Sequence, residues 1–177
     1  MEEEYIYIMI SRTNTFIGKL IRNTLKVEYN HCSLSFDSSL NHIYSFGRKK
    51  LYNVFVAGFV KESKNRGFFA MHDDANIILI RISVSYEEKI RMRNIIAKFE
   101  EDEEQYKYSL LGLVYCFLGI SVKRNNKYFC SHFVAEVLQR AGVEMFDKPA
   151  SLIRPHDFLK VPTAEYIYEG QIGLYNS

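Results

Sequence analysis

Cys130 stands at the start of the strongest helix pattern in the chain, where a thiol can act as a nucleophile. In residues 128–143, YFCSHFVAEVLQRAGV, apolar residues follow Cys130 at spacings of 3, 4, 7, 8 and 11, which predicts one buried helical face. Gly142 stands where a C-cap is expected. Unpaired backbone N–H groups in the first turn of a helix favour a thiolate and lower the pKa of the thiol. The alternative is that Cys130 is a small buried apolar residue, as free cysteines usually are.

His31 can supply the base that such a thiol needs. It opens the strand-like segment HCSLSF, residues 31–36. Alternation along a strand predicts two faces, with His31, Ser33 and Ser35 on a polar one and Cys32, Leu34 and Phe36 on an apolar one. The imidazole is therefore expected on the side where it can meet a cleft, and the alternative is an ordinary surface histidine. Cys32 and Cys116 stand among apolar residues and are expected in the core.

Strands and helices that would position these two residues can be followed along the chain. The first half is predicted to hold a strand at 5–11, a helix at 12–26 capped by Thr13, Asn14 or Thr15, and a hairpin of 31–36 and 42–47 joined by DSSLN. Residues 50–75 give no clear pattern apart from loop-like KNRG and MHDDAN. A strand at 76–85 precedes a helix from about Tyr86, in which Met92, Ile95, Ile96 and Phe99 form one apolar face.

The second half is predicted to be mostly helical. EEDEE at 100–104 is interpreted as a solvated helix end, with a partner site as the alternative. YSLLGLVYCFLGI, residues 108–120, is predicted to be a buried helix, and KRNNK a turn. After the helix that begins near Cys130, residues 149–158 are predicted to be a loop and 166–175 a strand. Strands and helices mix without a regular βαβ alternation, which indicates an α+β fold.

The composition is that of one ordinary globular domain spanning 1–177, with 47% hydrophobic and 25% charged residues. A formal charge of +2 gives no sign of a nucleic-acid partner. The longest apolar run, residues 110–120, is too short for a transmembrane segment, which takes about 20 residues. Three cysteines in no repeating pattern, and a beginning MEEEYIYIMI unlike an export signal, predict a reducing, cytoplasmic setting.

The order of these segments resembles the circularly permuted NlpC-type papain-like cysteine hydrolases, and is similar to the related lecithin:retinol acyltransferase-like group. SRTNTFIGKLIRNTLKVEYNH resembles the opening of that superfamily and places His31 at its histidine. FCSHFVAEVL resembles its Asn-Cys-Glu-His-Phe box, with Cys130 at the nucleophile, and RPHDF and YEGQIGLY resemble its closing segments. The resemblance implies a papain-like domain, an antiparallel sheet or open barrel packed against helices, in which the histidine strand precedes the cysteine helix.

Two departures from that pattern bear on activity. Phe129 and Ser131 stand where the box has Asn and Glu, which weakens the transfer of acyltransferase activity. The resemblance also implies a polar residue on the strand after the histidine that orients the imidazole. If DSS is the hairpin loop and Phe36 pairs with Leu40, His31 faces Ser45; a slip of one residue brings Tyr44 opposite, and His42 is nearer the turn. Ser45 is favoured, although a serine cannot stabilise an imidazolium as a carboxylate does.

The chemistry implied is cleavage of an amide, peptide-like or γ-glutamyl-like, or of an acyl bond, through a thioester on Cys130. The Cys130 backbone N–H is one candidate donor to the oxyanion. No metal or other cofactor is required, and His72, Asp73 and Asp74 are interpreted as surface residues because neighbours in a loop rarely face one ion. Two alternatives stay open: a lipid acyltransferase or phospholipase of the same fold, and a non-catalytic binding domain that kept it.

Overall fold

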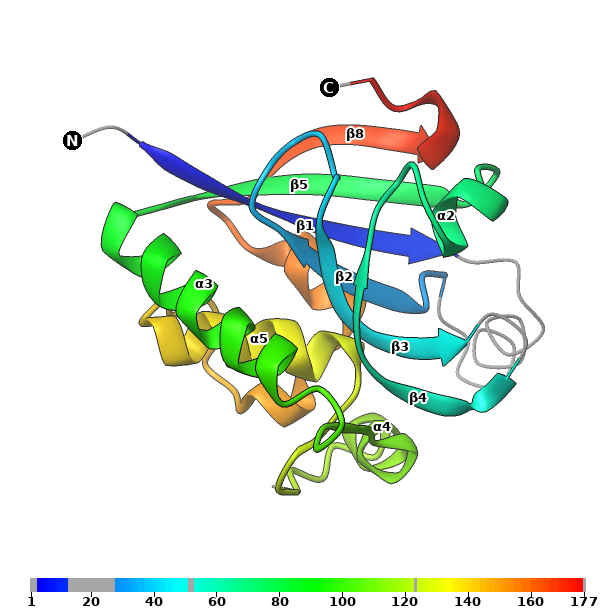
Figure 1. The fold of residues 1–177 in the computed structure, drawn as a ribbon. Helices are drawn as coiled ribbons and strands as arrows, with labels where there is room; N and C mark the ends of the chain where they lie inside the picture. Colours follow the sequence, from blue (N-terminus) through cyan, green and yellow to red (C-terminus); the bar gives the residue numbers. More distant parts are fainter. Residues whose placement is uncertain (1–2, 13–27, 51–52, 123, 177) are drawn as a thin grey trace.

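One eight-stranded sheet runs through the computed structural model, which describes residues 3–12, 28–50, 53–122 and 124–176. The order of strands is β7-β6-β4-β3-β2-β1-β5-β8 (Figure 1). Neighbouring strands are antiparallel except for the short pair β6 and β7, so the sheet is mixed. The strands are β1 Glu4–Arg12, β2 His31–Ser35, β3 Ile43–Lys50, β4 Asn53–Glu62, β5 Asn76–Val84, β6 Lys107–Tyr108, β7 Lys127–Tyr128 and β8 Glu165–Gln171.

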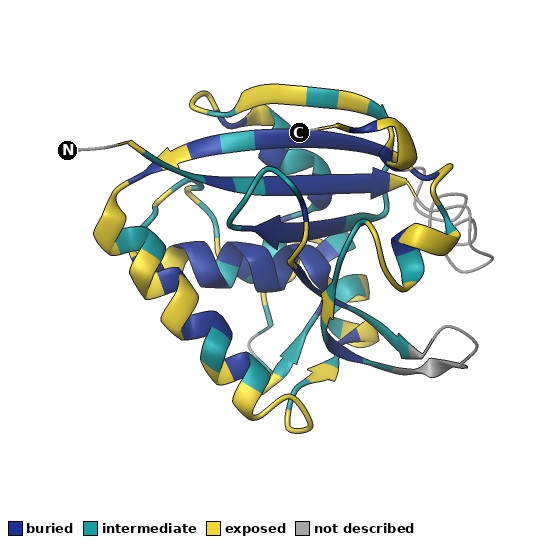
Figure 2. Ribbon diagram, turned by 45° about the horizontal axis from the view of Figure 1, so that its top comes forward, coloured by how far each residue is buried: buried dark blue, intermediate teal, exposed yellow. Residues whose placement is uncertain are grey.

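Two long helices, α3 and α5, lie against one face of this sheet (Figure 1). α5 is mostly buried, whereas α3 shows an exposed outer side (Figure 2). The described α-helices are α2 Phe68–Met71, α3 Tyr86–Glu101, α4 Leu110–Phe117 and α5 Cys130–Ala141, and the 3-10 helices are η1 Ala150–Leu152, η2 Pro155–Lys160 and η3 Ile172–Leu174.

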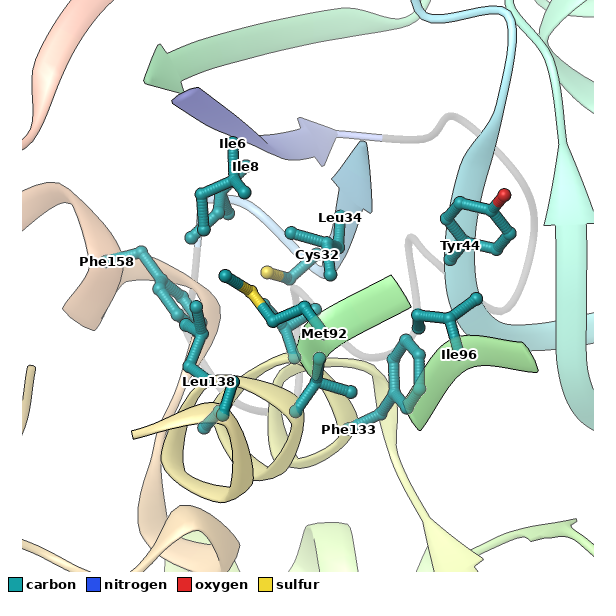
Figure 3. Close-up of a cluster of buried hydrophobic side chains, with 14 of the residues drawn as sticks. Ile6, Ile8, Cys32, Leu34, Tyr44, Met92, Ile96, Phe133, Leu138 and Phe158 are labelled. Carbon is teal, nitrogen blue, oxygen red and sulfur yellow. The ribbon is translucent and has the colours of Figure 1, made fainter. Parts of the chain in front are cut away.

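The main core fills the space between the sheet and these two helices. Successive strand side chains point to opposite faces, so alternate residues of neighbouring strands gather on the helix side. Cys32 and Leu34 of β2 meet Met92 of α3 and Phe133 of α5 there (Figure 3). Burying these apolar side chains is the main force that holds α5, and Cys130 with it, against β2 and β3.

A smaller core lies on the opposite face of the sheet. It is formed by Met9, Leu40, Ile43, Phe69, Ala75, Ile77, Leu79, Ile172 and Tyr175. Strands β1 and β5 contribute to both cores, which explains why each is an almost unbroken apolar run.

Several predictions from the sequence are confirmed. The fold is α+β, and the strands expected at 5–11 and 76–85 correspond to β1 and β5. α3 begins after Ser85, whose hydroxyl accepts from the Glu88 N–H in a capping box. The four apolar residues expected to form its inner face are buried: Met92, Ile95, Ile96 and Phe99.

Other predictions were wrong. Residues 149–158, expected as loop, contain η1 and part of η2, and the final strand ends at Gln171 before η3. The segment 50–75, for which the sequence gives no clear pattern, holds β4 and α2. The sheet is not purely antiparallel, because β6 and β7 run parallel. The helix expected at 12–26 falls almost wholly on 13–27, outside the described residues.

The prediction that YSLLGLVYCFLGI is a buried helix is half right. α4 forms, but only Cys116 among its residues is buried. Leu110 is 64% exposed and Leu118, just after the helix, is 65% exposed. Apolar composition alone gave the expectation of burial, and composition does not say whether another element is present to cover a helix.

Candidate functional site

Cys130 is the first residue of α5, as the apolar spacing predicts. Phe129 precedes the helix in extended conformation and provides no side-chain cap, so the first-turn N–H groups are left to other partners. Gly142 ends the helix in the left-handed conformation, with φ 90°, which confirms the predicted C-cap. The thiol is 3% exposed and is one of three free cysteines, all buried.

Burial dominates the chemistry of the Cys130 thiol. Desolvation raises its pKa to about 11, against the lowering effect of the backbone N–H groups of Cys32, Ser131 and Cys130 itself. Backbone N–H groups of this kind are the donors that a thiolate or an oxyanion needs. The Cys32 donor comes from β2 and is the neighbour of His31 in sequence.

Ser131 anchors the start of α5. Its hydroxyl is fully buried and donates to the Ile153 carbonyl, 2.7 Å away. The Cys116 thiol reaches the same carbonyl at 3.9 Å. Ser131 stands where the resembled box has Glu, and in this chain the residue fixes the helix terminus to the segment after η1.

His31 lies beside Ser45, the orienting residue favoured from the sequence. The imidazole Nε2 and the Ser45 Oγ are 3.3 Å apart. A hydrogen bond at Nε2 leaves Nδ1 as the ring nitrogen that can act as a base. Ser45 is fully buried, so this partner can hold one ring orientation.

The register that led to Ser45 differs from the predicted one. The ladder joins Leu34 to Tyr44 and Ser35 to Ile43, so the pairing is shifted by two residues from Phe36 opposite Leu40. A shift of two keeps every side chain on its face. Ser45 therefore stays on the face of His31, although its ladder partner is Val60 of β4.

The other two candidates for the orienting role lie elsewhere. Tyr44 points into the main core on the helix side, where the Lys61 Nζ lies 5.6 Å from its ring centroid. His42 is exposed and lines a surface pocket with Arg48 and Arg66. Neither is within hydrogen-bonding distance of His31 among the contacts of the described residues.

The imidazole of His31 is neutral at pH 7. Burial and, to a smaller extent, the nearby Arg48 guanidinium together lower its pKa to about 4. Arg48 also acts on Glu62, whose pKa burial raises to about 7. Sequence reasoning did not find Arg48 or the Cys32 backbone N–H, because neither stands in a recognisable motif and both depend on how the strands pair.

His31 and Cys130 are linked through the β2 backbone, because the Cys32 N–H near the sulfur belongs to the residue after His31. The side chain of Cys32 enters the main core beside α5, so alternation directs the His31 side chain to the other face. Within the described parts of the chain, no hydrogen bond or ion pair joins the thiol to the imidazole. Ladder pairs between β2 and β3 occur at Leu34 and Ser35 only, which leaves the His31 end of β2 unpaired on that side.

His132 is a buried histidine two residues after Cys130 on α5. Its ring lies 4.9 Å from that of Tyr128 and 5.4 Å from that of Phe129, and burial lowers its pKa to about 4. These aromatic contacts give it a packing role. Across the described residues, no group of three His, Cys, Asp or Glu side chains is placed to hold a metal ion.

Comparison with known proteins leaves the function to be argued from this geometry. No model of a known protein family matches the chain, and no curated protein is significantly similar to it. Among the helices of the described segments, none has the length and apolar character to cross a bilayer.

Proposed function

We propose that this protein is a cysteine hydrolase with a circularly permuted papain-like domain, and that it cleaves an amide or acyl bond through a thioester on Cys130. The observation that carries the proposal is that a thiol at the first residue of α5 lies against the β2 backbone beside His31, the first residue of that strand. The Cys32 N–H reaches the sulfur, and Ser45 lies within hydrogen-bonding distance of the imidazole Nε2. Three free cysteines suit a reducing compartment, and we place the protein in the cytoplasm.

In the proposed reaction the Cys130 sulfur attacks the substrate carbonyl as His31 Nδ1 accepts the thiol proton. The carbonyl oxygen becomes an oxyanion and receives hydrogen bonds from backbone N–H groups near the sulfur. When the oxyanion collapses, the bond to the leaving amine or alkoxide breaks and His31 gives it the proton. Water then adds to the thioester, with His31 as base, and the acid and the Cys130 thiol are released.

The resting protonation state sets a requirement on this reaction. With pKa values of about 11 for Cys130 and about 4 for His31, both groups are neutral at pH 7. Seven pKa units correspond to about 10 kcal/mol for a full proton transfer in the resting site. The proton must therefore move as the sulfur–carbon bond forms, and not in a prior ionisation step. The imidazole, which Ser45 contacts on the face of the sheet opposite the main core, must turn toward the thiol for this transfer.

p-Nitrophenyl acetate tests the proposal directly, because it supplies an activated carbonyl that needs no specific binding. We expect the wild-type protein to release p-nitrophenolate and to carry an acetyl group on the Cys130 peptide, detected by mass spectrometry. His31→Ala should slow acetylation of Cys130 at least 100-fold. Cys32 and Cys116 are internal controls, and acetylation of Cys130 no faster than theirs would contradict the proposal.

Two other functions each have an observation in their favour. α4 ends at Phe117, 13 residues before Cys130 in the sequence. Its exposed apolar side favours a lipid acyltransferase or phospholipase. The neutral, buried thiol favours a non-catalytic binding domain, as does the lack of a carboxylate partner for His31 among the described residues. An acyl chain transferred to a lipid acceptor distinguishes the first from a hydrolase, and a wild-type Cys130 that is never acylated indicates the second.

A further inference from the structure

α4 is apolar on the side that faces solvent as well as on the side that faces the protein. Leu111 is 55% and Val114 51% exposed, in addition to Leu110, Tyr115, Leu118 and Ile120. Scattered exposed leucines are ordinary, but a contiguous group of this size on one short segment marks an interaction site. Figure 1 shows α4 at the margin of the molecule.

The exposed residues form one face of the helix. At 100° per residue, Leu110, Val114, Leu118, Leu111 and Tyr115 fall within an arc of about 140°. Cys116, the buried residue of α4, lies nearly opposite the middle of that arc. The exposed side of α5 is different, because it carries Gln139 and Arg140. α4 therefore has a second apolar face with no cover among the described residues.

The sequence on both sides of α4 is basic. Residues 105–128 contain four Lys or Arg and no Asp or Glu, and three of the four cations, Lys107, Arg124 and Lys127, lie among the described residues. Lys107 and Lys127 are ladder partners on β6 and β7, so their backbones lie side by side. β6 leads directly into α4. The acidic run at 100–104 precedes this stretch, and two of its members are engaged elsewhere, Glu100 with Lys61 and Glu103 with Lys49.

We propose that α4 and the turn through Ile120 dock on an anionic lipid bilayer, with the helix lying in the plane of the interface. The apolar arc would enter the acyl boundary while the flanking cations contact lipid phosphates, which is the pattern of interfacial helices. A second copy of the chain fits less well, because a two-fold contact through α4 would bring Lys107 and Lys127 near their own counterparts. The inference rests on α4 and its surroundings and stands whether or not Cys130 is a nucleophile.

Docking there would place the start of α5 close to the bilayer. Phe129 packs near Gly112 of α4, where an added Cβ would lie 3.6 Å from the Phe129 ring. The Ser109 N–H also donates to the Tyr128 carbonyl, 2.8 Å away. α4 and the residue before Cys130 are therefore linked directly.

Vesicle co-sedimentation tests the proposal on the full chain. We expect the wild type to bind vesicles of phosphatidylcholine and phosphatidylglycerol (3:1) at least tenfold more strongly than pure phosphatidylcholine. Leu118→Glu should weaken that binding at least tenfold, and the double variant Lys107→Gln/Lys127→Gln about tenfold. Leu174→Glu is the matched control, because Leu174 is 70% exposed at η3, outside α4 and its flanks, and it should bind as the wild type does.

Each other outcome overturns the proposal. Equal loss in Leu118→Glu and Leu174→Glu would show unspecific adhesion, and equal binding to neutral vesicles would remove the role of the cations. Absence of vesicle binding, with a dimer in sedimentation velocity that Leu118→Glu dissociates, would identify a second copy as the occupant. Both variants change exposed side chains, and matching far-UV circular dichroism confirms that each is folded.

Discussion

Replacing Ser131 by alanine should loosen the terminus of α5 that carries Cys130. The Ser131 hydroxyl donates to the Ile153 carbonyl at 2.7 Å and is fully buried. Its removal leaves that carbonyl with only the weak Cys116 thiol donor at 3.9 Å, which costs about 1–3 kcal/mol. The better helix propensity of alanine offsets about 0.5 kcal/mol of this cost in the free energy of unfolding. The net loss in the free energy of unfolding is about 0.5–2.5 kcal/mol.

Urea unfolding followed by circular dichroism measures this loss, since the chain has no tryptophan. With a slope of about 2 kcal/mol/M, the midpoint should fall by about 0.3–1.2 M. Ser121→Ala is the matched control: Ser121 shares an exposed hydrogen bond of 2.9 Å with Ser151, and its loss should cost less than about 0.5 kcal/mol. Equal midpoints for the two variants would refute the assignment of Ser131 as the anchor.

Three further predictions follow from single contacts. Ser45→Ala removes the partner of the His31 Nε2 and should slow Cys130 acetylation about tenfold, less than His31→Ala does; an unchanged rate would leave Ser45 without an orienting role. Gly142→Ala should lower thermal stability by about 1–2 kcal/mol, because φ there is 90°, and an unaltered melting temperature would contradict this. Glu62 has a folded pKa of about 7, above its unfolded value, so stability should fall as pH rises from about 4.5 to 7 by up to about 3 kcal/mol. Glu62→Gln should flatten that fall in urea titrations at each pH, and an unchanged slope would exclude Glu62 as its cause.

The parts of the fold that depend on local pattern were predictable from the sequence. The four-residue apolar face of α3, the capping Ser85 and the left-handed Gly142 each carry a signal within a few residues. Cys130 at the first position of α5 follows from the same kind of periodicity. Local patterns identify an element and one of its faces, but not the elements that it packs against.

The parts that depend on pairing over distance were not predictable. The β2–β3 register differs by two residues because the connection between these strands is longer than DSS and includes Leu40 at positive φ, buried in the smaller core. Ser45 was nevertheless placed correctly beside His31, since an even shift preserves the face. The exposure of α4 could not be inferred, because burial depends on which elements surround a helix.

The rate of Cys130 alkylation by iodoacetamide, measured against pH by peptide mass spectrometry, tests the central claim most directly. At pH 7 a thiol of pKa about 11 is ionised to about one part in ten thousand, so unassisted alkylation is slow. If His31 assists, the wild-type rate rises as the imidazole loses its proton near pH 4, stays level, and rises again toward pH 11. His31→Ala should then lose the level region, about 100-fold at pH 7, and match the wild type near pH 11. A single rise toward pH 11 that is identical in both proteins would contradict the pairing of Cys130 with His31.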